Sequence, residues 1–199
     1  VILSQLIWTG TIDTDWNIPG NWSCGYVPGI NTPVLIPDVA NKPVLSTGAA
    51  ARVRDLVIDI GSSLTISGNT ISISGVITNN GLFNAADATV EMNGSNAQTI
   101  SSGSFSGNII KDLIVNNPAG VTLSGPLGIS GIVKAQSGDL SSGGNLTLLS
   151  SAVQTSLIAG SGSGNITGNV TMQRYLPSGY GYKYFSSPFQ AATVNEFND

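Results

Sequence analysis

The chain has 199 residues, of which only 9% are charged, and its formal net charge at pH 7 is −4. Because globular domains carry about 25% charged residues, we expect a surface solvated by hydroxyl and amide side chains, as in many extracellular β-proteins. The seven Lys and Arg residues are scattered; nucleic-acid binding needs clustered cations, so this function is not expected. No apolar run reaches the roughly 18 residues of a membrane span.

Residues 1–33 are rich in aromatic and turn-forming residues, including Trp8, Trp16 and Trp22. An open solenoid end exposes apolar core and unpaired backbone, and such a segment is placed to cover it. We therefore predict an N-terminal aromatic cap over residues 1–33. The alternative is that these three indoles are exposed and stack on sugar rings.

The stretch Asp13-Thr14-Asp15-Trp16-Asn17 begins like a calcium-binding loop. Asp13, Asp15 and Asn17 supply three oxygen ligands at a spacing that calcium accepts. The rest of the loop pattern fails, because Ile18 stands where such loops need Gly and Cys24 where they need Glu. The competing interpretation is that Asp15 and Asn17 cap turns around a buried Trp16. We therefore expect no cofactor, and calcium is the alternative.

Residues 34–165 contain short bursts of alternating apolar and polar residues, such as Ser63-Leu64-Thr65-Ile66-Ser67. Period-two alternation predicts strands with one apolar face. Residues 55–68 also match residues 112–125 at a constant offset of 57, which would be about three coils of 19–20 residues. Repeats of this kind predict stacked units. We predict an all-β protein, a right-handed parallel β-helix-like solenoid; a β-sandwich is the alternative.

Residues 166–199 differ in composition, with several aromatic residues close together. Tyr180, Tyr182 and Tyr184 alternate, so they would share one strand face. We predict the start of a second β module, truncated in this chain. The three tyrosines either form half of that module's core or, if exposed, bind glycans.

Catalysis is not expected. The chain has no histidine to activate its single thiol, Cys24. The acids that could pair in a glycosidase or lyase are Asp55, Asp59, Asp87, Glu91, Asp112 and Asp139. Asp55 and Asp112 occupy equivalent repeat positions, which favours a structural role at turns over a unique active site.

Several motifs resemble those of large secreted and surface proteins of Bacteroidota. They are Trp8-Thr9-Gly10, Asp15-Trp16-Asn17, Asn21-Trp22 and Tyr26-Val27-Pro28, followed by the repetitive β-rich region. Such proteins are similar to cargo of the type IX secretion system and include adhesins and non-catalytic parts of secreted enzymes. The resemblance covers most of the chain and implies a secreted or cell-surface location.

We therefore expect a non-catalytic extracellular segment that acts as an adhesin or structural spacer. A carbohydrate-binding accessory region of a secreted polysaccharide-degrading enzyme is the alternative. The expected partners are a surface polysaccharide or another cell-surface protein, and self-association through stacked coils is a further possibility.

Overall fold

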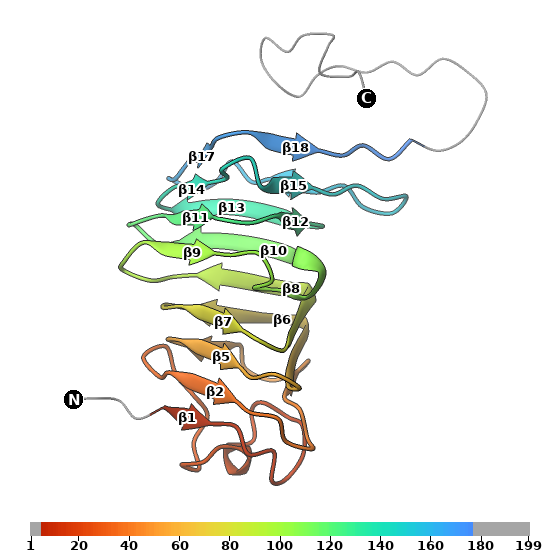
Figure 1. The fold of residues 1–199 in the computed structure, drawn as a ribbon. Coiled ribbons are helices and arrows are strands. Elements are labelled where there is room, and N and C mark those ends of the chain that lie inside the picture. The colour runs from red at the N-terminus through yellow and green to blue at the C-terminus, as the bar shows by residue number, and fades with distance from the viewer. Residues whose placement is uncertain (1–4, 177–199) are drawn as a thin grey trace.

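The computed structural model describes residues 5–176, which wind into a parallel β-solenoid of about seven turns (Figure 1). From the N-terminal end upward in Figure 1, front strands such as β5 run to the right and rear strands such as β6 run to the left, so the coil is right-handed. Every pairing between named strands is parallel. A β-sandwich is built from antiparallel sheets, so the solenoid prediction is confirmed.

Each full coil has three faces. The strands of the first face form two separate four-stranded sheets. The first of these sheets holds β1 (Leu6–Ile7), β2 (Val34–Ile36), β5 (Leu56–Ile58) and β7 (Ile77–Asn79). The second holds β9 (Gln98–Ile100), β11 (Val121–Leu123), β14 (Leu140–Ser141) and β17 (Ile166–Thr167).

The second and third faces share one ten-stranded sheet. The second face contains β3 (Val44–Leu45), β12 (Leu127–Ile129), β15 (Leu146–Leu148) and β18 (Val170–Met172). The third face contains β4 (Ala51–Val53), β13 (Ile132–Ser137) and β16 (Leu157–Ile158). The long strands β6 (Ser63–Ile73), β8 (Leu82–Met92) and β10 (Ile109–Asn116) run through both faces. Their pairing register shifts at the corner, and such irregularities let a strand bend.

Inward side chains of successive coils stack into apolar columns. On the third face, Ile71 pairs with Val90, Val90 with Leu113 and Leu113 with Val133, and all four are fully buried. This arrangement follows from the period-two pattern, because the strands are parallel and the residues in register share one face. The buried columns form one continuous hydrophobic core through the coils.

The 57-residue sequence repeat does not correspond to whole coils. Leu56 lies in β5 on the first face, whereas its repeat partner Leu113 lies in β10 on the third face. The chain takes eight steps from one strand segment to the next between β5 and this part of β10, and three such steps make one coil. The repeat is therefore two and two-thirds coils rather than the expected three, and a strand-and-turn unit of one face recurs on another.

Asp55 and Asp112 have the same role in this repeat. The Asp55 carboxylate accepts a hydrogen bond from Val76 N at 3.0 Å, and the Asp112 carboxylate accepts one from Ile132 N at 2.7 Å. Each acid thus caps the corner of the next coil, as its repeated position predicted. The residues before these two amides, Gly75 and Gly131, pass so close to the carboxylates that a Cβ would collide with them.

The N-terminal segment folds against the first coils and contains the 3-10 turn η1 (Pro19–Asn21); a second, η2 (Ser106–Asn108), precedes β10. At the other end, β17 pairs with β14 and β18 with β15. The solenoid ladder therefore continues beyond the boundary predicted at residue 165. The second β module predicted for residues 166–199 lies mostly outside the described residues and stays a prediction.

Candidate functional site

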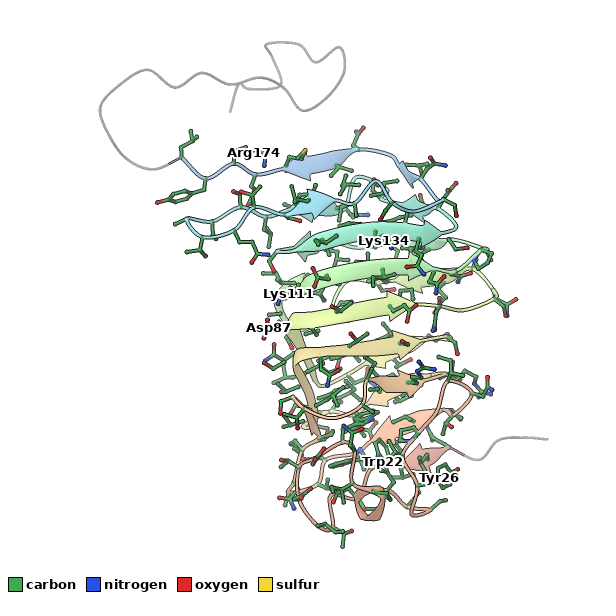
Figure 2. The ribbon with its side chains drawn as sticks, turned by 180° about the vertical axis from the view of Figure 1, so that it is seen from behind. Trp22, Tyr26, Asp87, Lys111, Lys134 and Arg174 are labelled. Carbon is green, nitrogen blue, oxygen red and sulfur yellow. The ribbon has the colours of Figure 1, made fainter. Side chains whose placement is uncertain are left out.

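The three tryptophans of the N-terminal segment are buried and pack on each other. Trp22 makes edge-to-face contacts with Trp8 and Trp16, with ring centroids 5.0 and 4.7 Å apart. Figure 2 places Trp22 within the cap, whereas Tyr26 on the same segment is exposed. The hypothesis that Trp8, Trp16 and Trp22 stack on sugars is wrong, because their ring faces are covered by the core. Tyr180, Tyr182 and Tyr184 lie outside the described residues.

The side chains proposed as calcium ligands make hydrogen bonds around the N-terminal segment. Asp13 Oδ1 accepts hydrogen bonds from Asp15 N and Asn21 Nδ2, and Asp15 Oδ1 accepts one from Asn17 N at 2.9 Å. Asn17 itself donates to Thr47 O. Within residues 5–176 no group of three or more His, Cys, Asp or Glu side chains lies together. The turn-capping interpretation is confirmed for Asp15, whereas Asn17 bridges to the later loop at Thr47. Calcium binding by these three side chains stays a prediction.

Five of the six acids that could serve in catalysis connect coils at separate places. Glu91 accepts hydrogen bonds from Ser72 Oγ and Asn116 Nδ2, which belong to the coils on either side of it. Asp139 accepts one from Asn165 N. Asp87 lies beside Lys111 of the next coil at 3.2 Å, and Figure 2 labels both on the same side of the solenoid. These three acids, like Asp55 and Asp112, join neighbouring coils, whereas the Asp59 carboxylate makes no hydrogen bond within residues 5–176.

The ladder of the first face is interrupted between β7 and β9. These strands are successive on this face, yet they do not pair, and the face divides there into its two sheets. The inward positions on either side of the break carry amides instead of apolar side chains: Asn79 on β7 and Gln98 on β9. The corresponding position to Asn79 on the preceding coil is Ile58, which is fully buried.

The Gln98 side chain takes the place of the missing strand pairing at one end of the break. Its Nε2 donates to Gly75 O at 2.8 Å and to Ile73 O at 3.0 Å. Its Oε1 accepts hydrogen bonds from Gly94 N and from the buried Asn117 on the next coil. A buried amide is tolerated there because its donor and acceptor atoms are both satisfied.

Asn79 bridges the other end of the break. Its Nδ2 donates to Gly103 O at 2.9 Å, in the loop that follows β9. The two coils are therefore joined by side-chain amides at both ends of the break, and no backbone ladder joins them between.

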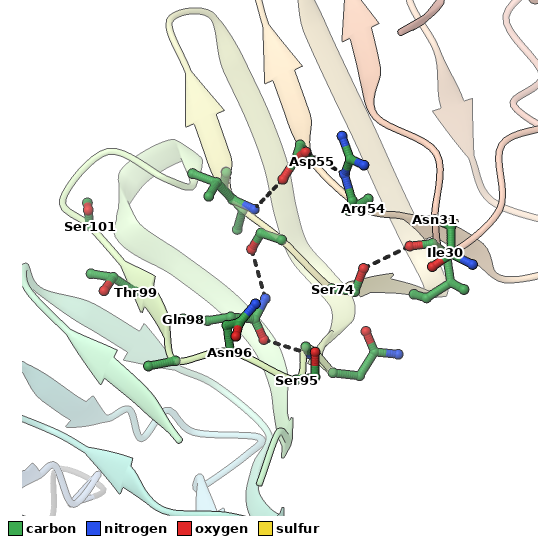
Figure 3. Close-up of a pocket in the computed structure, with 16 residues that line it drawn as sticks. Ile30, Asn31, Arg54, Asp55, Ser74, Ser95, Asn96, Gln98, Thr99 and Ser101 are labelled. Atoms are coloured by element: carbon green, nitrogen blue, oxygen red, sulfur yellow. Dashed lines mark hydrogen bonds and ion pairs between the residues drawn. The ribbon is translucent and has the colours of Figure 1, made fainter. Parts of the chain in front are cut away.

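A groove of about 690 Å³ opens between the two strands (Figure 3). One wall is formed by residues 74–77 and the other by residues 93–99 and Ser101, with Ile30 and Asn31 from the loop before β2. Among its lining side chains only Arg54 and Asp55 are charged, and they form an ion pair at 2.7 Å. The groove volume lies within the roughly 300–1,000 Å³ typical of ligand pockets.

The chemistry of this groove is neutral hydrogen bonding beside a small apolar area. Asn, Ser and Thr side chains line it, no aromatic residue does so within the described range, and Ile77 contributes apolar surface. Ile77 is only partly buried, whereas Leu56 at the same position of the preceding coil is fully buried. The break in the ladder thus exposes a short part of the core.

This groove was not predicted from the sequence. Asn79 and Gln98 interrupt inward columns that are otherwise mainly apolar, so two amides at inward positions of neighbouring strands were the available signal. Reading that signal requires the strand register, because a shift by one residue turns each side chain to the opposite face.

The fold defines the class of the protein as a parallel β-solenoid with an N-terminal aromatic cap. The model of a domain of unknown function (DUF8693) matches residues 7–109, which is more than half of the chain, so the chain belongs to this family. No curated protein and no solved structure matches the chain. The matched range includes most of the cap, the break between β7 and β9 and the residues that line the groove.

Proposed function

We propose that this chain is a non-catalytic segment of an extracellular or cell-surface protein and acts as a structural spacer that holds other modules apart. The observation that carries the proposal is the ten-stranded parallel sheet, whose ladder continues from β3 to β18. Hydrogen bonds between neighbouring strands resist bending more than flexible connections do, and such a solenoid keeps its ends at a fixed separation.

Contacts between coils support the same role. The buried columns on the third face give each coil an apolar surface that only its neighbours cover. The side chains of Asp55, Asp112 and Glu91 join consecutive coils at the surface. The low charge of the chain is typical of extracellular β-proteins, and no helix among residues 5–176 is long and apolar enough to cross a membrane.

The spacer role is tested by measuring the distance between two spin labels. Cys24 is exposed and is the single cysteine of the chain, so it accepts one label, and Thr171→Cys at an exposed position of β18 accepts the other. Seven coil steps of about 4.8 Å each give a rise of about 34 Å along the solenoid. A stiff spacer gives one narrow distance distribution, which broadens when the same protein is unfolded in urea. A broad or multiple distribution under native conditions would exclude a rigid spacer.

An adhesive role belongs to the same proposal and has its own test. The purified chain is applied to an array of surface polysaccharides, with calcium and with chelator. Saturable binding to one polysaccharide class would support adhesion or the accessory carbohydrate-binding role, and loss of binding in chelator would point to calcium. Labelling of intact cells of the source organism with an antibody against the chain tests the cell-surface location.

A further inference from the structure

We propose that the groove between β7 and β9 binds an extended peptide segment of a partner protein, which adds a strand to the interrupted first face. The inference goes beyond the spacer role and is independent of it. It rests on the directions of the backbone groups along the two walls, on the partly exposed Ile77 and on the neutral lining.

On the lower wall, the backbone of Ile77 points into the break. Leu56 N donates to Val76 O at 2.9 Å, and Asn80 N donates to Ile58 O at 2.8 Å. Residues 76, 78 and 80 therefore pair with β5, and the alternation of a strand turns the N–H and C=O of Ile77 to the opposite side. Neither group has a hydrogen-bond partner among residues 5–176.

On the upper wall, the backbone of Thr99 points into the same break. Gln98 N donates to Gly120 O at 3.1 Å, and Ser124 N donates to Ile100 O at 2.9 Å. Gln98 and Ile100 therefore pair with β11, and the N–H and C=O of Thr99 face β7. They too lack partners within the described part of the chain. Two unpaired strand edges thus line opposite walls of one groove.

Unpaired strand edges of this kind are templates for another strand. A peptide main chain offers alternating donors and acceptors on both of its sides, so an inserted strand would pair with Ile77 and Thr99 together. An inward apolar side chain of that strand would cover the exposed part of Ile77, and neutral outward side chains suit the surrounding Asn and Ser residues. The occupant is therefore an uncharged segment with alternating apolar and polar residues, as on the other strands of this face.

The probe is a synthetic peptide that copies residues 118–125, the segment around β11, together with a pool of eight-residue peptides that alternate Val or Ile with Thr or Ser. Backbone hydrogen exchange is measured residue by residue. At a peptide concentration ten times the Kd, the Ile77 and Thr99 amides are expected to exchange about tenfold more slowly. The Asn80 amide, which already donates to Ile58 O, reports any general change in stability. A copied peptide with Pro in place of its central Thr is the negative control.

Substitutions of Thr99 separate its backbone donor from its side chain. Thr99→Pro removes the N–H that faces the groove but no hydrogen bond of the β9–β11 ladder, a place where a strand tolerates proline. Thr99→Ala keeps that N–H. We expect Thr99→Ala to retain peptide binding and Thr99→Pro to lose it, with Ser124 amide exchange unchanged in both. Should Thr99→Pro disturb the ladder, Ile77→Pro makes the same test on the opposite wall.

Three outcomes would overturn the proposal. The first is that neither the copied peptide nor the pool protects the Ile77 and Thr99 amides. The second is that Thr99→Pro, correctly folded, binds peptide as tightly as the unaltered chain. The third is that oligosaccharides protect these amides while peptides do not, which would make the groove a glycan site. None of these outcomes bears on the spin-label distance that tests the spacer role.

Discussion

The ten-stranded sheet and the first face are built from the same kind of coil but differ in continuity. In the ten-stranded sheet the inward residues are apolar in each of the central coils, and the ladder is unbroken. On the first face two inward positions hold Asn79 and Gln98, and the ladder stops between them. At the break, side-chain bridges from these two amides take the place of strand pairing, and a groove lies between the strands.

The strongest test of this comparison is to truncate one inward residue in each region. Leu113 is fully buried between Val90 and Val133, so Leu113→Ala should lower the free energy of unfolding by about 2–5 kcal/mol. Ile77 is only partly buried beside the groove, and Ile77→Ala should cost about 1–2 kcal/mol. Urea unfolding measures both values. Equal losses would contradict the view that the break leaves Ile77 partly uncovered.

The sequence predicted the unbroken region well and the broken region poorly. Alternation in segments such as 63–67 was sufficient to predict stacked strands, because it depends on local order alone. The repeat offset of 57 residues predicted the shared role of Asp55 and Asp112 but suggested three coils, since a linear repeat does not distinguish one face of a coil from another.

The groove between β7 and β9 could not be predicted from the sequence alone, because its recognition requires the strand register. Trp8, Trp16 and Trp22 were candidates for sugar stacking because aromatic residues serve equally well in a core and on a binding surface. In the sequence nothing distinguishes Gln98 from other polar residues of a strand. The strand register shows that its side chain is inward and within hydrogen-bond reach of Gly75 O on the preceding coil.

A second prediction concerns the amide bridge. Gln98→Leu keeps a side chain of similar size but leaves Gly75 O and Gly94 N without their partners, whereas Ile73 O keeps the hydrogen bond from Asn93 N. Since buried polar groups without partners are costly, this change should lower the free energy of unfolding by about 2–4 kcal/mol. Gln136→Leu, at an exposed position of β13, is the matched control and should have little effect. A neutral Gln98→Leu would mean that the bridge does not hold the two coils together.

A third prediction compares a corner beside the groove with a corner of the continuous sheet. Asp55→Ala and Asp112→Ala each remove the acceptor of one backbone N–H of the next coil, so each should cost about 1–3 kcal/mol in thermal or urea unfolding. Asp59, whose carboxylate makes no hydrogen bond within residues 5–176, provides the control. If only Asp112→Ala were destabilising, the two repeated positions would not be equivalent in energy.

The smallest expected effect is a pH dependence at the exposed surface of the continuous sheet. The hydrogen bond from Lys111, then that from Ser67, and the positive charge of Lys111 lower the pKa of Asp87 below its ordinary value of 3.8. A carboxylate with a lowered pKa in the folded state stabilises the fold at pH values above its unfolded pKa. That stabilisation is lost as the pH falls through the folded pKa.

The substitutions Asp87→Asn and Lys111→Met should therefore reduce stability slightly at pH 7, and the difference from the unaltered chain should disappear as the pH falls through the acidic range below 4. Added salt should weaken the same effect, because both side chains are substantially exposed. Nuclear magnetic resonance titration of the Asp87 carboxyl carbon gives the direct measurement. In Lys111→Met its pKa should rise toward the ordinary value, and an unchanged pKa would show that the neighbouring coil does not act on this carboxylate.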